Sequence, residues 1–176
     1  HDSLKRHLME KRDVITASTA DPDALPSLVG EVISEDTLWA CTTCGYCEAA
    51  CPIELEHLPK FYRMRQHRVL MEGTFPHELK PVFEAYEAQS NPWGFPADAR
   101  GDWARDLGVV RVETAEQGKD LDYLFYVGSA ASFDPRGQKI ARAFAAILQQ
   151  AGVKFGILGS AETSTGVCVR RAGNEM

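Results

Sequence analysis

The sequence has no apolar run that approaches the roughly 20 residues needed to span a membrane as a helix. It also shows no N-terminal stretch with the basic, apolar and small-residue regions of a secretory signal peptide. These absences exclude a spanning helix and a signal peptide from the 176 residues. We therefore expect any association with a membrane to come through a partner or through segments outside this sequence.

An excess of basic residues is lacking as well, because 19 lysines and arginines stand against 25 aspartates and glutamates, for a net charge of −6. That balance argues against a nucleic-acid partner recognised through its phosphates. The dinucleotide fingerprint G-x-G-x-x-G is also missing, since residues 128–132 read Gly-Ser-Ala-Ala-Ser. The sequence thus predicts no nucleic-acid partner and no flavin or nucleotide site.

Cysteine is scarce, with five residues in the whole chain, four of them between positions 41 and 51 and the fifth at Cys168. An odd number of cysteines, four of which lie in one stretch, is not the framework of a disulfide-stapled secreted domain and indicates a reducing compartment. We predict a cytoplasmic protein, either free or peripheral at the inner face of the membrane.

The four clustered cysteines, Cys41, Cys44, Cys47 and Cys51, are followed by Pro52 and follow the pattern C-x2-C-x2-C-x3-C-P. This is the spacing of [4Fe–4S] ligation in bacterial-type ferredoxins. A tight loop with a cysteine at every third position can wrap three thiolates around one cube, and its backbone N–H groups can face the sulfides. Gly45 lets this loop adopt a positive φ. The sequence therefore predicts that these four cysteines bind metal as ligands of iron–sulfur clusters.

The fourth cysteine of such a run ligates the other cluster in two-cluster ferredoxins. We therefore expect Cys41, Cys44 and Cys47 to hold one cube, and Cys51 to contribute to a second cube whose other ligands lie outside this sequence. The alternative is that Cys51 closes a single cluster locally. We expect the native polypeptide to extend beyond residues 1 and 176, because the sequence opens at His1 without an initiator Met and stops after a sheet too small to stand alone.

Three other uses of these cysteines are less well matched. Structural zinc sites favour two separated C-x2-C pairs, and a disulfide framework needs an oxidising compartment. Thiol–disulfide catalysis by Cys44 and Cys47 would place the pair at the start of a helix that follows a strand, and no strand is expected before Cys44. The rival from another class is a non-redox module, stapled by zinc or acting as a scaffold for partner subunits.

Helical periodicity dominates the first half of the chain, with helices expected over 1–14, from Ser34 into the cysteine loop, over 54–72 and over 76–89. The third of these carries a basic patch, which we interpret as a solvated helix face; the alternatives are that it docks an acidic partner or that it moderates the charge of the cluster. Its members are Lys60, Arg63, Arg65, His67 and Arg68.

The periodicity changes in the second half. A short strand is expected at 109–112, the continuous apolar run at 123–127 predicts a buried parallel strand, and a further strand is expected at 155–158. Between the last two, Asp134 is the expected cap and Pro135 the first residue of a helix that runs to residue 150. Strand, helix and strand make a βαβ unit, whose functional loops would be 128–134 and 159–168. The side chains expected to face inward from the helix are Ile140, Phe144, Ile147 and Leu148.

From Ser34 onward the chain resembles the iron–sulfur oxidoreductase family that includes heterodisulfide reductase subunits and the glycolate oxidase iron–sulfur subunit. The segments that carry the resemblance are Leu38-Trp-Ala-Cys-Thr-Thr-Cys, Cys47-x3-Cys51-Pro52, Asn91-Pro-Trp-Gly, Gly128-x-Ala-x-Ser-Phe-Asp and Arg170-Arg-Ala-Gly-Asn-Glu175.

The resemblance implies an α+β chain in three parts. They are a small all-α, ferredoxin-like [4Fe–4S] domain at 1–96, a linker at 97–120, and at 121–176 the start of a partial α/β domain of the cysteine-rich type. It also implies an oxidoreductase component that relays electrons between a flavoprotein and a thiol–disulfide or quinone acceptor, with a flavoprotein or other redox subunits as partners. No catalytic residue is assigned.

Two positions depart from the family. A cysteine commonly follows Gly128 and another commonly precedes the Thr-Gly pair, whereas this chain has Ser129 and Ser164. A hydroxyl is a poor iron ligand beside a thiolate, so a cluster in the second domain is left open. Cys168 is not expected to substitute for either position.

Overall fold

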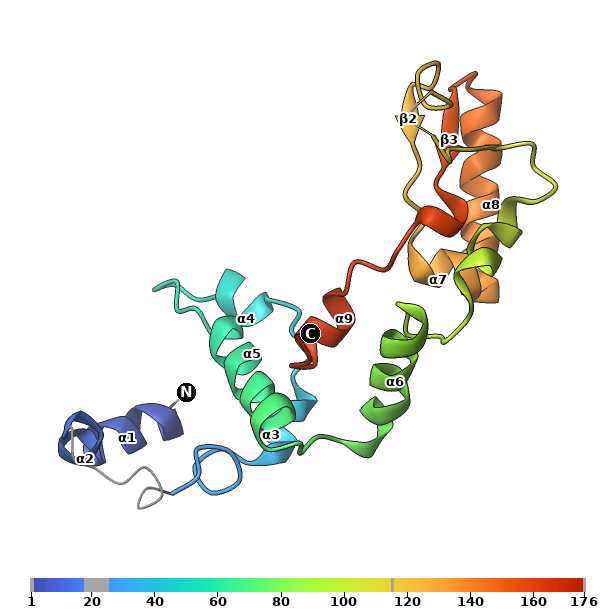
Figure 1. The fold of residues 1–176 in the computed structure, drawn as a ribbon. Helices are drawn as coiled ribbons and strands as arrows, with labels where there is room; N and C mark the ends of the chain where they lie inside the picture. Colours follow the sequence, from blue (N-terminus) through green and yellow to red (C-terminus); the bar gives the residue numbers. More distant parts are fainter. Residues whose placement is uncertain (1, 18–25, 115, 176) are drawn as a thin grey trace. The chain divides into compact units, whose positions relative to one another are not determined.

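The computed structural model of the chain describes residues 2–17, 26–114 and 116–175, and Figure 1 shows its fold. The chain divides into two compact units, the first made of residues 1–76 and 170–176 and the second of residues 77–169. The predicted division differs, since it placed the first domain at 1–96 and a linker at 97–120. Residues 77–96 group with the second unit, in which Trp93 and Phe95 lie against Phe133.

The first unit, in its described part, consists of short helices joined by loops, with one isolated bridge between Val29 and Ile33. Its helices are α1 (Asp2–Glu10), α2 (Arg12–Thr16), α3 (Glu35–Ala40), α4 (Tyr46–Ala49), α5 (Leu58–Gln66) and the π-helical turn η2 (His67–Met71). The helix expected from residue 54 begins later, because Glu54 has a φ of 52°, which lies outside the helical region.

Helix α3 leads directly into the cysteine loop. Ser34 caps it as predicted, since its Oγ accepts a hydrogen bond from the N–H of Thr37 at 3.3 Å. Glu35 and Asp36 lie in the first turn, where their carboxylates interact favourably with the positive end of the helix dipole. Leu38 is fully buried and holds the helix in place. The position at which the cysteine loop begins is therefore fixed.

The second unit contains a three-stranded parallel sheet with the order β1-β3-β2. The strands are β1 (Val110–Arg111), β2 (Tyr123–Leu124) and β3 (Phe155–Ile157), with Val110 paired to Gly156 and Tyr123 to Phe155. The strands are shorter than the apolar runs that predict them. The helices of this unit are η3 (His77–Leu79), α6 (Lys80–Gln89), η4 (Ala97–Ala104), α7 (Gly128–Phe133), α8 (Pro135–Gln150), η5 (Gly159–Ala161) and the start of α9 (Val167–Arg171).

The expected start of α8 is confirmed, because the Asp134 carboxylate accepts a hydrogen bond from the N–H of Gly137 at 2.8 Å and Pro135 opens the helix. Figure 1 shows α8 beside the sheet. The expected inward face is wrong in part, because Ile140 and Ile147 are 64% and 62% exposed. Ala141 and Ala145 are buried instead, in one cluster with Trp103 of η4 and with Phe155 and Ile157 of β3.

The segment predicted as a linker supplies part of this core. Within η4, Trp103 is 3% exposed, and its ring meets Phe125 edge-on with a centroid separation of 6.0 Å. Arg142 of α8 donates to the carbonyl oxygen of Trp103 at 2.6 Å and pairs with Asp106. This pairing holds the pKa of the Asp106 carboxyl well below its usual range, at about 2. The segment is thus bound to α8 by both apolar and ionic contacts.

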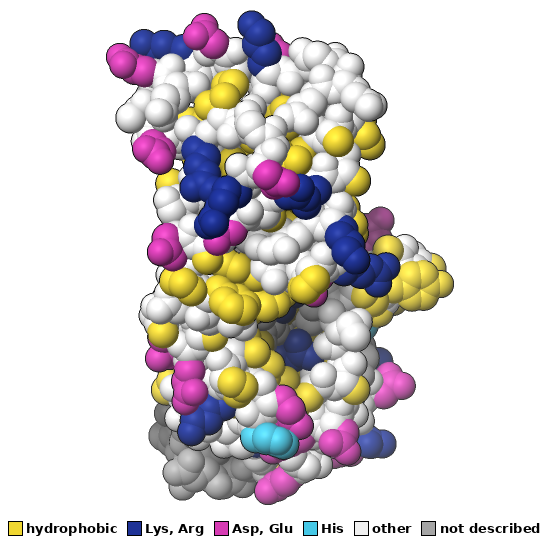
Figure 2. All heavy atoms as spheres, turned by 90° about the vertical axis from the view of Figure 1, so that its right-hand side faces the viewer, with side chains coloured by type: hydrophobic (Ala, Val, Ile, Leu, Met, Phe, Trp, Pro, Cys, Tyr) yellow, Lys and Arg dark blue, Asp and Glu magenta, His cyan; other side chains and the backbone are white. Residues whose placement is uncertain are grey.

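The surface mixes apolar and charged side chains, as the face in Figure 2 shows. On α8, Ile140, Phe144 and Ile147 form an exposed apolar stripe at helical spacing. Among the described residues, no helix has the length and apolar character needed to cross a membrane.

Candidate iron–sulfur site

The four clustered cysteines lie along one short turn of chain between α3 and α5. Cys41 ends α3, Cys44 lies in the loop, Cys47 lies in α4, and Cys51 follows α4. All four thiols are free of disulfides, with Cys44 and Cys47 exposed and the other two half-buried. Cysteines that are free of disulfides are available to bind metal.

The backbone of the loop turns through two left-handed residues. Gly45, which begins α4, has a φ of 81°, as the sequence predicts. Thr43 has a φ of 55°, although it is not a glycine, and is 3% exposed. A buried threonine in this conformation is strained, and the surrounding fold must hold it there. Such strain is common where a loop is shaped to bind a ligand.

Backbone N–H groups face two of the sulfurs. The N–H of Leu55 lies 3.4 Å from the Sγ of Cys51, and this contact and the N–H of Ile53 lower the pKa of the Cys51 thiol. The N–H of Tyr46, followed by the Thr42 hydroxyl, lowers the pKa of the Cys44 thiol. Hydrogen bonds to the charged form favour the thiolate, which is the form that binds metal.

This arrangement predicts a pH shift in the reactivity of Cys44. In the folded, metal-free chain its thiolate persists to lower pH than in the unfolded chain, because the folded-state pKa is lowered. We expect the midpoint of its alkylation rate by iodoacetamide against pH, followed by peptide mass spectrometry, to be lower in the folded chain than in urea. An equal or higher midpoint in the folded chain would show that the N–H groups do not act on this sulfur.

Glu48, between Cys47 and Cys51, fixes the loop to the next helix. Its carboxylate accepts hydrogen bonds from the N–H groups of His57 and Leu58, at 2.6 and 2.7 Å. These are N–H groups at the start of α5, which lack partners within the helix. A carboxylate there also interacts favourably with the positive end of the helix dipole and so stabilises the helix. The segment that carries Cys47 and Cys51 is therefore held against α5 (Figure 1).

Replacing Glu48 by alanine should lower the free energy of unfolding of the chain by about 1–2 kcal/mol, the usual cost of removing a charged helix cap. Glu48→Gln should cost less, because its amide oxygen still accepts a hydrogen bond. Urea unfolding followed by circular dichroism gives both values. Glu56→Ala, at an exposed position nearby, is the matched control, and an equal cost for Glu56→Ala and Glu48→Ala would contradict the capping role.

A buried guanidinium lies against the start of the loop. Arg65 of α5 is 5% exposed and donates to the carbonyl oxygens of Leu38, at 2.7 and 3.2 Å, and of Cys41, at 2.6 Å. It also lies over the ring of Trp39, 5.2 Å from the centroid. Burial lowers the pKa of Arg65, while Cys41 and Tyr62 raise it.

The basic patch expected on the helix over 54–72 is therefore not one solvated face. Arg65 is buried, and Arg68 forms ion pairs with Glu35 and Glu72. His67 also lies 3.1 Å from Glu72. Charged residues spaced along a helix can face different neighbours, and the sequence alone does not show which of them are paired.

The residues of this loop fit an iron–sulfur cluster in their donor chemistry. They supply four free thiols and N–H groups directed at sulfur, and Arg65 of α5 lies beside Cys41. The indole N–H of Trp39 is also buried and has no acceptor within the described part of the chain. Across the same residues, no three His, Cys, Asp or Glu side chains are close enough to hold one metal ion. A cube is wider than a single ion and takes its thiolates at a greater separation.

The second unit places the two serines predicted to replace cysteines among protein partners. Ser129 accepts a hydrogen bond from Arg100 at 2.9 Å. Ser164 is hydrogen-bonded to Tyr86, whose hydroxyl lies 3.3 Å from the Sγ of Cys168. Burial, followed by the contact with Cys168, raises the pKa of Tyr86.

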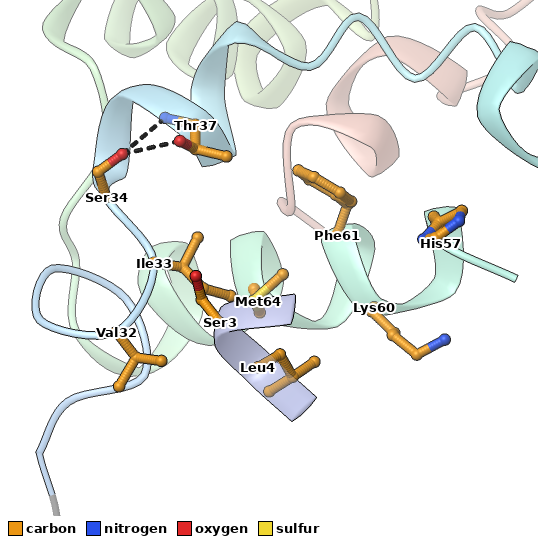
Figure 3. A pocket seen from close by; sticks show the side chains of 10 residues that line it. All are labelled: Ser3, Leu4, Val32, Ile33, Ser34, Thr37, His57, Lys60, Phe61 and Met64. Atoms are coloured by element: carbon orange, nitrogen blue, oxygen red, sulfur yellow. Dashed lines mark hydrogen bonds between the residues drawn. The ribbon is translucent and has the colours of Figure 1, made fainter. Parts of the chain in front are cut away.

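The first unit also contains a cavity of about 340 Å³ between α1, residues 32–37 and α5, shown in Figure 3. Its lining residues are Ser3, Leu4, Val32, Ile33, Ser34, Thr37, His57, Lys60, Phe61 and Met64. None of these ten is a cysteine, so this cavity is distinct from the loop that carries the thiols.

The sequence did not identify Glu48 as part of this site, and it identified Arg65 only as one member of a basic patch. Glu48 caps a helix that begins ten residues later, and Arg65 contacts carbonyls 24 and 27 residues away. Neither distance follows a helical or strand period, so no local pattern in the sequence marks them.

Comparison with known proteins relates the chain to three iron–sulfur or redox proteins. It is 45% identical over 157 residues to the probable iron–sulfur-binding oxidoreductase FadF of Bacillus subtilis, covering 87% of this chain and 22% of that protein. It is 39% identical over 151 residues to the EtfAB:quinone oxidoreductase of Syntrophomonas wolfei, covering 85% and 21%. It is 27% identical over 169 residues to a subunit of the dihydromethanophenazine:CoB–CoM heterodisulfide reductase of Methanosarcina mazei, covering 96% and 39%.

The chain thus spans about a fifth of the length of the first two of these curated relatives. No protein-family profile matches it, and no solved structure matches it. The similarity to the curated relatives extends over most of this chain, including the cysteine loop. On this evidence, the chain belongs to the iron–sulfur oxidoreductase family of these proteins.

Proposed function

We propose that this chain is an electron-transfer component in which Cys41, Cys44 and Cys47 hold one [4Fe–4S] cluster. Cys51 contributes to a second cluster, in keeping with the role of the fourth cysteine in this spacing. The observation that carries the proposal is the loop itself, with four free thiols in the C-x2-C-x2-C-x3-C-P pattern and N–H groups directed at sulfur.

An iron–sulfur cluster supplies one-electron redox chemistry when it is bound. The chain's own residues hold and tune it. The three cysteines act as thiolate ligands, and Gly45 and Thr43 give the loop its left-handed turns. Glu48 holds the loop to α5, and the Trp39 ring, two residues before Cys41, lies against the guanidinium of Arg65. Burial and hydrogen bonds of this kind set the reduction potential of such sites.

The partners in this proposal are redox subunits. A reduced flavoprotein gives up electrons one at a time, and a quinone or a disulfide accepts them. The support comes from the relatives, one of which is named an EtfAB:quinone oxidoreductase and another a heterodisulfide reductase subunit. We place the protein in the cytoplasm, either free or peripheral at the inner face of the membrane through a partner or a further segment.

Reduction of the anaerobically purified full chain tests this proposal. We expect a broad visible absorption band that dithionite bleaches, with one electron added per cluster, and a paramagnetic signal in the reduced state. Reoxidation should restore the band. A protein without visible absorption, or one whose absorption dithionite does not change, would contradict an electron-transfer role.

A further inference from the structure

The Arg65 guanidinium is a buried cation whose charge is not balanced by a carboxylate. It is 5% exposed, and in the described part of the chain no Asp or Glu lies within ion-pair distance of it. Its partners are the carbonyl oxygens of Leu38, Cys41 and Arg171. A charge taken out of water is costly unless an opposite charge compensates it.

Other arginines of the chain show the usual solution. Arg68 pairs with Glu35 and Glu72, and Arg100, which is equally buried, pairs with Glu162 at 3.0 Å. Arg65 differs because its carbonyl partners satisfy its N–H groups but carry no net charge. The compensating negative charge must therefore come from another source close to the guanidinium.

The position of Arg65 identifies that source. Its Nη2 lies 2.6 Å from the carbonyl oxygen of Cys41, the first ligand of the proposed cluster. Thiolates and the sulfides that they surround bring negative charge to this point. Its Nη1 binds the carbonyl of Arg171 at 2.9 Å, and Gly173 packs against the Arg65 backbone so closely that a Cβ would lie 2.5 Å from it. The Arg65 backbone is thus packed against Gly173, and its guanidinium is held between the carbonyl oxygens of Cys41 and Arg171.

We infer that Arg65 is the charge-compensating residue of the cluster held by Cys41, and that its positive charge raises the reduction potential of that cluster. This inference rests on the proposed function. Reduction adds one electron to the cluster and forms or breaks no bond. A nearby fixed cation stabilises the more negative, reduced state, and it does so more strongly in a water-poor site than at the surface.

The test compares Arg65→Gln with Arg63→Gln in the full chain under anaerobic conditions. The reduction potential is measured by redox titration of the visible or paramagnetic signal of the cluster held by Cys41, which is identified as the signal that is lost in Cys41→Ala. Arg63 lies on the same helix and is exposed, so Arg63→Gln loses the same charge in water. For Arg65→Gln we expect the ratio of reduced to oxidised cluster at a fixed potential to fall about tenfold, or about 59 mV for a one-electron couple. Arg63→Gln should change this ratio less than about twofold.

Arg65→Lys separates charge from hydrogen-bond geometry, because lysine keeps the charge and loses the planar fork of donors. We expect its potential to shift less than half as far as that of Arg65→Gln. Equal potentials for Arg65→Gln and Arg63→Gln would overturn the inference, as would equal shifts for Arg65→Gln and Arg65→Lys. Loss of bound iron or of helix content in Arg65→Gln would overturn it too, because the residue would then maintain the fold. Absence of iron from the unmodified chain would instead refute the proposed function.

Discussion

Replacing Cys41, Cys44 or Cys47 by alanine, one at a time, should remove nearly all of the iron and labile sulfide of the cluster that these three residues hold. A cube loses part of its attachment when one of its thiolates is removed, because alanine offers no ligand atom in its place. The measurement is iron and sulfide content after anaerobic purification, together with the visible band. Serine at the same positions should retain only slightly more iron and sulfide than alanine does, because a hydroxyl is a poor iron ligand.

Cys168→Ala is the matched control, since it removes a thiol from the second unit, where Cys168 contacts Tyr86. It should leave iron content unchanged. Cys51→Ala gives further information, because a ligand of a second cluster should reduce the iron content without removing the signal that depends on Cys41. Retention of full iron content in the Cys44→Ala variant would show that this loop is not the cluster site.

Replacing Glu162 by alanine should destabilise the second unit by about 3–5 kcal/mol, the largest stability effect that we expect in this chain. The carboxylate of Glu162 and the guanidinium of Arg100 are 2% and 3% exposed and lie 3.0 Å apart. Glu162 also accepts hydrogen bonds from the N–H groups of Val127 and Gly128, at 3.0 and 2.8 Å. Its removal leaves a buried cation without an opposite charge and two part-buried N–H donors without their acceptor.

Urea unfolding followed by tryptophan fluorescence and circular dichroism measures this loss. Glu87→Ala, at an exposed position of α6, is the control and should change the free energy of unfolding by less than about 0.5 kcal/mol. The double replacement Arg100→Met with Glu162→Leu should recover part of the loss, because no charge is then buried alone. A cost below about 1 kcal/mol for Glu162→Ala would indicate that this pair is hydrated in solution.

Local features of the structure could be predicted from the sequence because they depend on residues a few positions apart. Ser34 caps α3, Asp134 caps α8, and Gly45 adopts a positive φ, all as expected. Each depends on the chemistry of one side chain or on the absence of a Cβ. The ligand positions Cys41, Cys44, Cys47 and Cys51 likewise come from a spacing rule, and they remain a prediction.

Features that depend on distant contacts could not be predicted in this way. Residues 97–104 have little apolar periodicity, yet Trp103 is buried in the second unit against Phe125. Helix α8 offers two apolar stripes, and the sequence favoured the one with larger side chains. Ala141 and Ala145 are buried in one cluster with Trp103, Phe155 and Ile157, whereas Ile140 and Ile147 are exposed. Long-range packing therefore decided both outcomes.

Iron and acid-labile sulfide analysis of the anaerobically purified full chain tests the central claim most directly. The account predicts iron and sulfide in equal amounts, about four of each for every cluster bound, with zinc absent. A chain that contains zinc without sulfide, or neither iron nor sulfide, would contradict it.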